Sequence, residues 1–252
     1  MSTATLERAP DERSADASTV PAWIGLVRAG AIVMVVFAVV LQATARTIIP
    51  PVLVIGLVFL AAAPFLRGER RGLGLGLALF GTAAYIGNLP IIIDDLTHPE
   101  SAPAFVLQVL STVGVALVVI GGVAAWLRRP TRLLQPVALA AAGVFLVGTV
   151  GSIAVAAGTD SVAALPDDVQ VTAEQLMWAP EAISIDGAAT GIWIDNKDGI
   201  RHTFTIPELG IDVEVPALKA RRVDIDAPAG SYQIICEVPG HESMTGTLTI
   251  SS

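Results

Sequence analysis

The sequence has little of two residue types that build metal and redox sites. Its 252 residues include one cysteine and three histidines. A single cysteine excludes an intrachain disulfide framework. No histidine lies at the centre of an apolar stretch, so a haem held by paired histidines inside a helical bundle is excluded as well. No chain of acidic or basic residues crosses those stretches, which argues against a proton pump.

Positive charge is also scarce, and it is unevenly placed. The formal net charge is −8. Residues 1–159 carry ten Arg, no Lys and eight acidic residues, whereas residues 160–252 carry five basic and fifteen acidic residues. With 53% of its residues apolar, the chain is too hydrophobic for one ordinary soluble domain. The sequence therefore predicts a membrane region and an acidic soluble domain, and no nucleic-acid partner.

Five apolar stretches occupy the first region. They cover residues 22–44, 48–66, 72–93, 104–127 and 133–157, and each is close to the ~20 residues that a helix needs to cross a bilayer. Backbone hydrogen bonding in lipid favours helices. We predict an α-helical membrane bundle of five transmembrane helices over residues 22–157, preceded by a disordered cytoplasmic tail, residues 1–21. A linker, residues 158–168, follows and extends to no more than about 35–40 Å.

The arginines give these helices a direction. The segments 67–71 (RGERR) and 128–132 (RRPTR) are basic, whereas 94–103 (DDLTHPESAP) has no Lys or Arg. Basic loops stay on the cytoplasmic side of a membrane. The N-terminus is therefore expected inside and the C-terminal domain outside. This topology suits an integral protein of a bacterial or archaeal plasma membrane.

From residue 169 onward, apolar residues alternate with polar ones. The alternation covers residues 202–206, 211–215, 222–226, 232–236 and 247–250. Turn pairs such as Asp198-Gly199 and Pro239-Gly240 separate the runs. Short alternating strands with frequent turns are typical of a β-sandwich. We predict seven or so antiparallel strands in an all-β sandwich over residues 169–252.

The only cysteine lies near the C-terminus in the motif CEVPGHESM, residues 236–244. This motif supplies a thiolate from Cys236, an imidazole from His241 and a thioether from Met244. His202, at an inward-facing strand position, is the only other imidazole of the domain. A copper ion that cycles between two oxidation states prefers this set of ligands. The alternative is structural, with Cys236 as a small buried residue, His241 in a surface loop and Met244 filling the core.

Two segments resemble the cupredoxins, the blue-copper family of plastocyanin and azurin. They are NKDGIRHTF (196–204) and PAGSYQIICEVPGHESMTGTLTI (228–250), and the resemblance covers roughly residues 168–251. It implies a Greek-key sandwich with one mononuclear type 1 copper. It also implies His202, Cys236 and His241 as equatorial ligands and Met244 as the axial ligand. The spacing Cys-x4-His-x2-Met is shorter than the azurin-like Cys-x4-His-x3-Met, and Thr203 stands where many relatives have Asn.

A four-ligand site with no open position suits one-electron transfer, and this is the function that we expect. The resemblance implies that the imidazole of His241 passes the electrons, inside an apolar patch of Val238, Pro239 and Gly240. We expect a redox partner near the outer membrane surface, with a basic docking face for this acidic domain. The same ligands also allow a different function, copper handling outside the membrane without electron transfer.

Catalysis by this chain alone is not expected. The dinuclear copper domain of cytochrome oxidase needs two cysteines, and multicopper oxidases and copper nitrite reductases need many more histidines than the chain has. We expect an electron carrier, alone or as a subunit of a larger oxidoreductase complex. The loop 94–100 (DDLTHPE) leaves three interpretations open. It is a solvated loop, a metal site that uses Asp94, His98 and Glu100, or a surface that docks against the sandwich.

Overall fold

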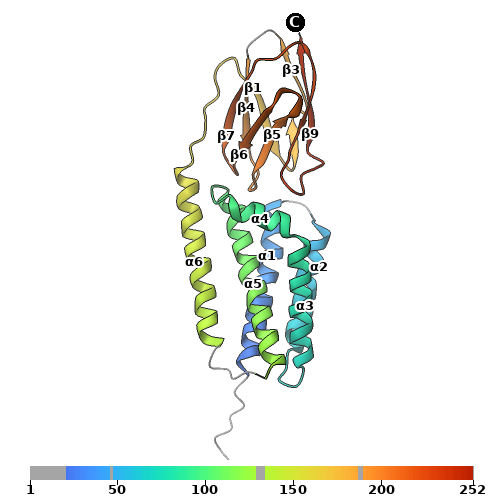
Figure 1. Ribbon diagram of the computed structural model, residues 1–252, viewed down its shortest axis with the longest axis vertical. Helices are drawn as coiled ribbons and strands as arrows, with labels where there is room; N and C mark the ends of the chain where they lie inside the picture. The colour runs from blue at the N-terminus through green and yellow to red at the C-terminus, as the bar shows by residue number, and fades with distance from the viewer. Residues whose placement is uncertain (1–20, 46–47, 129–133, 187–189, 252) are drawn as a thin grey trace, which may run out of the picture.

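A helical part and a β-sandwich follow each other along the chain and stack end to end (Figure 1). The computed structural model describes residues 21–45, 48–128, 134–186 and 190–251. The tail predicted for residues 1–21 lies outside the described residues except for Pro21, and so does most of the basic segment 128–132.

Helices occupy all five predicted apolar stretches, but they are not five uniform spans. The elements are α1 (Ala22–Ala45), α2 (Pro50–Ala62), the 3-10 turn η2 (Ala63–Phe65), α3 (Arg71–Gly87), α4 (Leu89–Thr97), α5 (Ala102–Trp126) and α6 (Leu134–Gly158). Within the described residues, α1, α5 and α6 are long and apolar enough to cross a membrane. The bent pair of α3 and α4 counts as a fourth span if it is taken as one. The apolar helix Pro50–Phe65 is shorter than these spans.

A bend divides the third apolar stretch, which the sequence analysis treated as one helix. α3 and α4 meet at Asn88 at an angle of 69°. Pro90 lies in the first turn of α4, and a proline has no N–H to continue the hydrogen bonds of the preceding helix. The bend lays α4 across the end of the bundle, directly under the sandwich (Figure 1). Asp94 and Asp95, expected in a loop, are therefore in a helix.

α5 is the central helix of the bundle, and glycines let its neighbours approach closely. A Cβ at Gly30 of α1 would lie 2.6 Å from the carbonyl oxygen of Gly114 in α5. A Cβ at Gly122 of α5 would lie 2.5 Å from the carbonyl oxygen of Gly74 in α3. Small residues permit such packing between membrane helices. α6 packs mainly against α5 and leaves most of its apolar side chains exposed.

The sandwich consists of two sheets, with strand orders β2-β1-β4-β7 and β3-β9-β8-β5-β6. Its strands are β1 (Val169–Glu174), β2 (Met177–Ala179), β3 (Ala182–Asp186), β4 (Thr190–Asn196), β5 (His202–Ile206), β6 (Ile211–Val215), β7 (Ala220–Ile225), β8 (Gly230–Ile235) and β9 (Thr245–Ser251), with the 3-10 turn η4 (Pro207–Leu209) after β5. All five predicted alternating runs are strands. The prediction of a purely antiparallel sandwich is wrong, because β1 pairs with β4 and β3 pairs with β9 in parallel. Alternation records which face of a strand is buried and carries no information about the direction of its neighbour.

The linker after α6 is hydrogen-bonded to the sandwich at several residues. The indole N–H of Trp193 donates to the carbonyl of Val162 at 2.7 Å. The backbone N–H of Ala220 donates to the hydroxyl of Ser161 at 2.8 Å. The chain therefore becomes part of the sandwich within a few residues of Gly158, the last residue of α6.

Candidate metal centre

The ends of three adjacent strands bring the four predicted ligands to one end of the sandwich. His202 is the first residue of β5, Cys236 follows β8, and His241 and Met244 lie in the loop between β8 and β9. These strands are neighbours in one sheet. All four side chains are buried, with exposed fractions of 0% for His202, 5% for Cys236, 8% for His241 and 1% for Met244.

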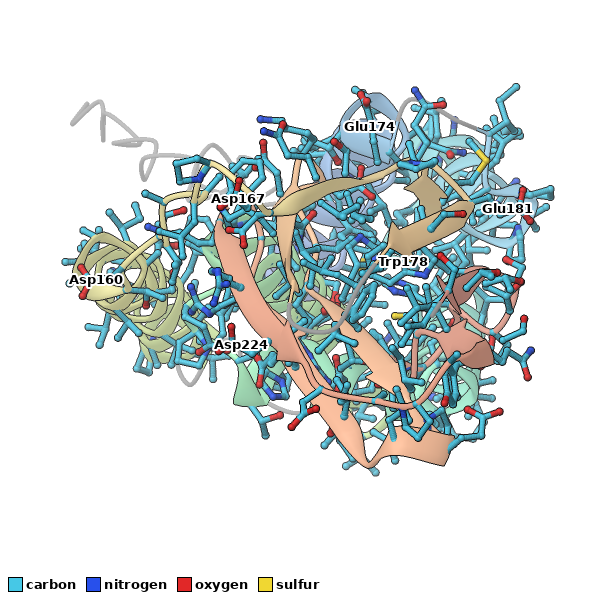
Figure 2. All side chains as sticks on the ribbon, turned by 90° about the horizontal axis from the view of Figure 1, so that it is seen from above. Asp160, Asp167, Glu174, Trp178, Glu181 and Asp224 are labelled. Carbon is cyan, nitrogen blue, oxygen red and sulfur yellow. The ribbon has the colours of Figure 1, made fainter. Side chains whose placement is uncertain are left out.

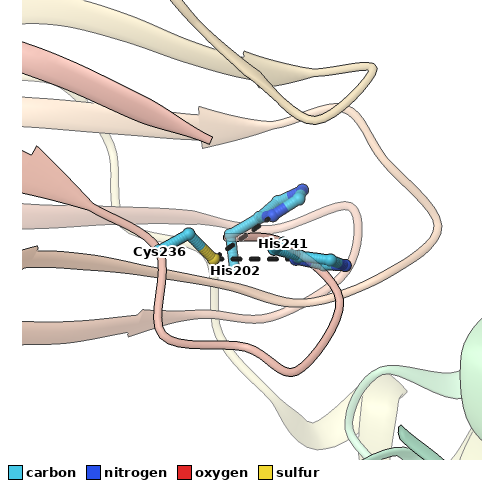
Figure 3. Close-up of side chains that lie close together, drawn as sticks. All are labelled: His202, Cys236 and His241. Carbon is cyan, nitrogen blue, oxygen red and sulfur yellow. Dashed lines mark hydrogen bonds between the residues drawn. The ribbon is translucent and has the colours of Figure 1, made fainter. Parts of the chain in front are cut away.

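The thiol of Cys236 faces one ring nitrogen of each histidine (Figure 3). Its Sγ lies 3.9 Å from Nδ1 of His202 and 3.6 Å from Nδ1 of His241. Metal–sulfur and metal–nitrogen bonds of about 2.3 Å and about 2.0–2.1 Å, at tetrahedral to trigonal angles, place such donors about 3.6–3.8 Å apart. The two observed distances are within about 0.1 Å of this range, so the three side chains fit a single metal ion. A thiolate with two imidazoles is the donor set of a blue-copper site.

The ligand loop is held closed by its own backbone. The N–H of Cys236 donates to the carbonyl of Met244 at 3.1 Å, and the N–H of Met244 donates to the carbonyl of His241 at 2.8 Å. The N–H of His241 donates to the carbonyl of Val238 at 3.0 Å. Gly240 has φ +87°, a conformation that favours glycine. These contacts fix Met244 beside Cys236, in the same apolar core.

Two polar side chains that the sequence analysis did not assign a role hold His202 in position. The carboxylate of Asp198 lies 3.0 Å from Nε2 of His202, so it accepts the ring proton and leaves Nδ1 free to bind a metal. The buried amide of Asn196 lies within 2.8–3.1 Å of the carbonyl oxygens of Ile200, Val215 and Pro216. The segment NKDGIRH was quoted as a family motif, and the structure gives its Asn and Asp these positioning contacts.

Thr203 joins the two ligand-bearing segments. Its backbone N–H lies 3.4 Å from the Sγ of Cys236. Its hydroxyl accepts a hydrogen bond from the N–H of Glu237 at 2.7 Å. The residue after the first histidine therefore ties the chain before and after Cys236 to β5.

The metal-free site favours a thiolate. Burial alone raises the pKa of Cys236, but hydrogen bonds from His202 and His241 lower it to about 5. Burial alone lowers the pKa of His202, but its contacts with Asp198 and Cys236 raise it above its ordinary value. The deprotonated sulfur that a metal requires is thus already present at neutral pH.

We expect the thiolate absorbance of the metal-free, folded protein to be lost with a midpoint near pH 5. In the unfolded chain the same thiol should titrate at about 8.5. Because the folded pKa is the lower one, the thiolate stabilises the fold above pH 8.5, and this contribution declines as the pH falls to about 5. A midpoint of the folded protein near 8.5 in an ultraviolet pH titration contradicts the prediction.

We expect Asp198→Asn to weaken copper binding about 10- to 100-fold, because the residue that orients a metal-binding histidine typically contributes that much. The measurement is competition for copper against a chelator of known affinity. Asp226→Asn, at an exposed carboxylate of the same domain, is the matched control and should bind copper as the unmodified chain does. Equal copper affinity in the two variants would show that Asp198 does not contribute to copper binding.

The segment 94–100 docks against the sandwich. The guanidinium of Arg201 binds the carboxylate of Asp94, with Nε 3.0 Å from Oδ2. The Nε2 of His98 lies 3.9 Å from a carboxylate oxygen of Glu214, and Glu100 completes a second group of metal-ligating atoms within 4.8 Å of one another. Asp94 is not part of this group. Arg201 lies 4.0 Å from Glu214 and already supplies positive charge there.

The chain has one family-model match and several matches to solved structures. Residues 141–250 match a family model described as a cupredoxin-like domain. A copper-containing nitrite reductase from Thermus scotoductus matches at 18% identity and TM-score 0.31, over 37% of this chain and 24% of its own. Amicyanin from Paracoccus versutus matches at 18% identity and TM-score 0.30, over 35% of this chain and 85% of its own. The chain thus spans about a quarter of the nitrite reductase. A comparison with curated proteins finds no match.

The donor set and the matched domain agree with each other. A cupredoxin-like domain that gathers His202, Cys236, His241 and Met244 is consistent with one mononuclear type 1 copper site. Within the described residues, the ligand atoms of His202, Cys236 and His241 lie close together. Met244 lies beside them, because its carbonyl accepts a hydrogen bond from the backbone N–H of Cys236.

Proposed function

We propose that the cupredoxin-like domain within residues 141–250 is a membrane-anchored, extracytoplasmic blue-copper electron carrier. His202, Cys236 and His241 would hold the copper, with Met244 as the axial ligand. Copper bound there supplies one-electron chemistry, by alternating between two oxidation states. The chain would serve as a carrier, alone or within a larger oxidoreductase complex, rather than as a catalyst.

One observation carries this proposal: a buried thiol and two buried imidazole nitrogens converge at 3.6 and 3.9 Å. The strands, the ligand loop and the Asp198 contact hold these donors in place before metal arrives. Small rearrangement between oxidation states favours fast electron exchange, and a fixed set of ligands limits that rearrangement. The four buried side chains also leave no open position for a substrate.

The arrangement of the helices supports a membrane anchor with the sandwich outside. The chain runs toward the sandwich in α1, away from it in α2, toward it in α3, away in α5 and toward it in α6 (Figure 1). The basic segment 67–71 lies at the end of the bundle opposite the sandwich (Figure 1). Basic loops face the cytoplasm. Five passes with the N-terminus inside would therefore place the copper domain outside.

The surface charge of the sandwich favours a partner with a basic face. Figure 2 looks down on the sandwich and shows acidic side chains spread over it, at Asp167, Glu174, Glu181 and Asp224, with Asp160 beside it at the end of α6. A negative surface attracts a basic protein and raises the rate of encounter at low ionic strength. The exchange rate with such a partner should fall as salt is added.

The test is spectroscopic and uses the full chain in detergent. Copper(II) is added in one equivalent, and the visible spectrum, the electron paramagnetic resonance spectrum and the electron exchange with a small cobalt complex are recorded. An intense charge-transfer band, a narrow copper hyperfine splitting and rapid exchange are expected. A pale spectrum with wide splitting would overturn the blue-copper site. A blue site that exchanges no electrons would favour copper handling instead.

A further inference from the structure

The end of the sandwich that carries the proposed copper ligands rests on α4. On one side of the site, Arg201 directly precedes His202 and binds Asp94 of α4; the two side chains are 11% and 12% exposed. On the other side, Gly240 directly precedes His241 and approaches Ile91 of α4. A Cβ at Gly240 would lie 3.4 Å from Cδ1 of Ile91. Each proposed histidine ligand is therefore flanked by a contact with the membrane region.

Two more contacts extend this interface to the corner between α4 and α5. The backbone N–H of Ala217 donates to the hydroxyl of Ser101 at 3.0 Å. A Cβ at Gly199 would lie 3.4 Å from Cβ of Pro103. Figure 3 shows the ligand loop directed toward the helical part, and Figure 1 shows α4 beneath the strand ends. We call this contact the α4 cover, defined by Ile91, Asp94 and Ser101.

The α4 cover lies over the side of the site where the proposed ligands are nearest to solvent. Of the four proposed ligands, His241 is the most exposed, at 8%, and its loop is the one that meets Ile91. Electron transfer between proteins requires a close approach of their redox centres. A protein that must reach the edge of His241 therefore meets α4 first.

We propose that the α4 cover closes the copper edge to water-soluble redox proteins, and that the sandwich must separate from α4 before such a protein can exchange an electron with it. This inference rests on the proposed electron-transfer function. The partner class is a water-soluble redox protein with a basic face. The exchange moves one electron between the partner's redox centre and the copper, and it moves no proton and breaks no bond.

The contact has the character of a reversible interface. Within the described residues, the helical core and the sandwich core are two separate apolar clusters that share no residue. The two parts are joined by the ion pair of Arg201 with Asp94, the contact of His98 with Glu214, one hydrogen bond to a backbone N–H and the contacts of Ile91 and Pro103 with glycines of the sandwich. Small polar interfaces between domains permit relative motion. Figure 2 views the sandwich from the side opposite the helices, and the acidic side chains labelled there lie outside the α4 cover, so a basic partner can collect there before the edge opens.

The test compares a large and a small electron partner on the copper-loaded full chain in detergent. The large partner is a basic c-type cytochrome, and the small one is a tris(phenanthroline)cobalt complex. Each partner serves as electron donor or electron acceptor, depending on whether its reduction potential is below or above that of the copper. Asp94→Asn removes the charge that holds Arg201. Its matched control is Asp168→Asn, which removes the buried carboxylate that Arg222 binds within the sandwich. We expect Asp94→Asn to raise the second-order rate with the cytochrome at least tenfold and the rate with the cobalt complex less than threefold.

A second readout needs no copper. In the metal-free chain, backbone hydrogen exchange of residues 237–243 should become at least tenfold faster in Asp94→Asn, and it should stay unchanged in Asp168→Asn. Ser101→Ala opens the interface without touching Arg201, and it should act in the same direction in both experiments. Unchanged cytochrome rates and unchanged exchange in Asp94→Asn and Ser101→Ala would overturn the cover while leaving the proposed function intact. A wild-type site that is not blue, or that does not react with the cobalt complex, would overturn the proposed function and the cover with it.

Discussion

Cys236→Ser is expected to remove the visible colour of the copper-loaded protein completely. The intense band of a blue-copper centre arises from charge transfer between the thiolate and the copper, and a serine hydroxyl provides no such donor. Cys236 is the only cysteine of the chain, so no other thiolate can replace it. The measurement is the visible spectrum of the full chain with one equivalent of Cu(II).

The control for this experiment separates the loss of a donor from damage to the core. Ile234→Val removes one methylene from a fully buried residue of β8, two positions before Cys236, which typically costs about 0.5–1.5 kcal/mol of stability. It should stay blue. A coloured Cys236→Ser variant would show that the proposed copper site is wrong, whereas a colourless Ile234→Val variant would attribute the effect to folding.

Met244→Leu is expected to keep the copper and to raise its reduction potential. Leucine matches methionine in volume but offers no sulfur, so the higher oxidation state loses a weak ligand while the packing is retained. A tenfold loss of affinity for Cu(II) relative to Cu(I) corresponds to about 59 mV for one electron. We therefore expect a rise of about 60 mV or more, measured by redox titration of the visible band.

The control exchanges the same two side chains elsewhere in the core. Leu248→Met alters a fully buried residue of β9 that is not among the proposed ligands, and its potential should stay that of the unmodified chain. An unchanged potential in Met244→Leu would remove Met244 from the copper coordination. Loss of all copper would show that the side chain of Met244 is needed to bind the copper and does more than set its potential.

The candidate site was predictable because its residues carry local signals. Cys236, His241 and Met244 lie within nine residues, and the alternation of β5 places His202 on the inward face. The structure brings Cys236, His202 and His241 to metal-binding distances, although the assignment of all four as copper ligands stays a prediction. The contacts that support His202 were visible only as a motif, because a role for Asp198 depends on where the loop folds.

Other features depend on contacts that no local pattern records. Arg201 and Asp94 are 107 positions apart, and neither has a neighbour in sequence that indicates its partner. The parallel pairs of β1 with β4 and β3 with β9 result from crossovers between distant segments. The bend at Asn88 did have a signal, Pro90, which the prediction of one continuous span over residues 72–93 did not use.

The bonded linker determines how far the copper site can travel. Ser161 and Val162 are fixed to the sandwich, so the link between Gly158 and Ser161 is two residues long, and its three Cα–Cα steps reach about 10 Å when extended. A sandwich on so short a tether can turn on its pivot, but it stays at nearly constant height above the bilayer. Its encounters with another membrane protein are therefore a search in two dimensions, and a membrane-bound partner must carry its redox centre at that same height.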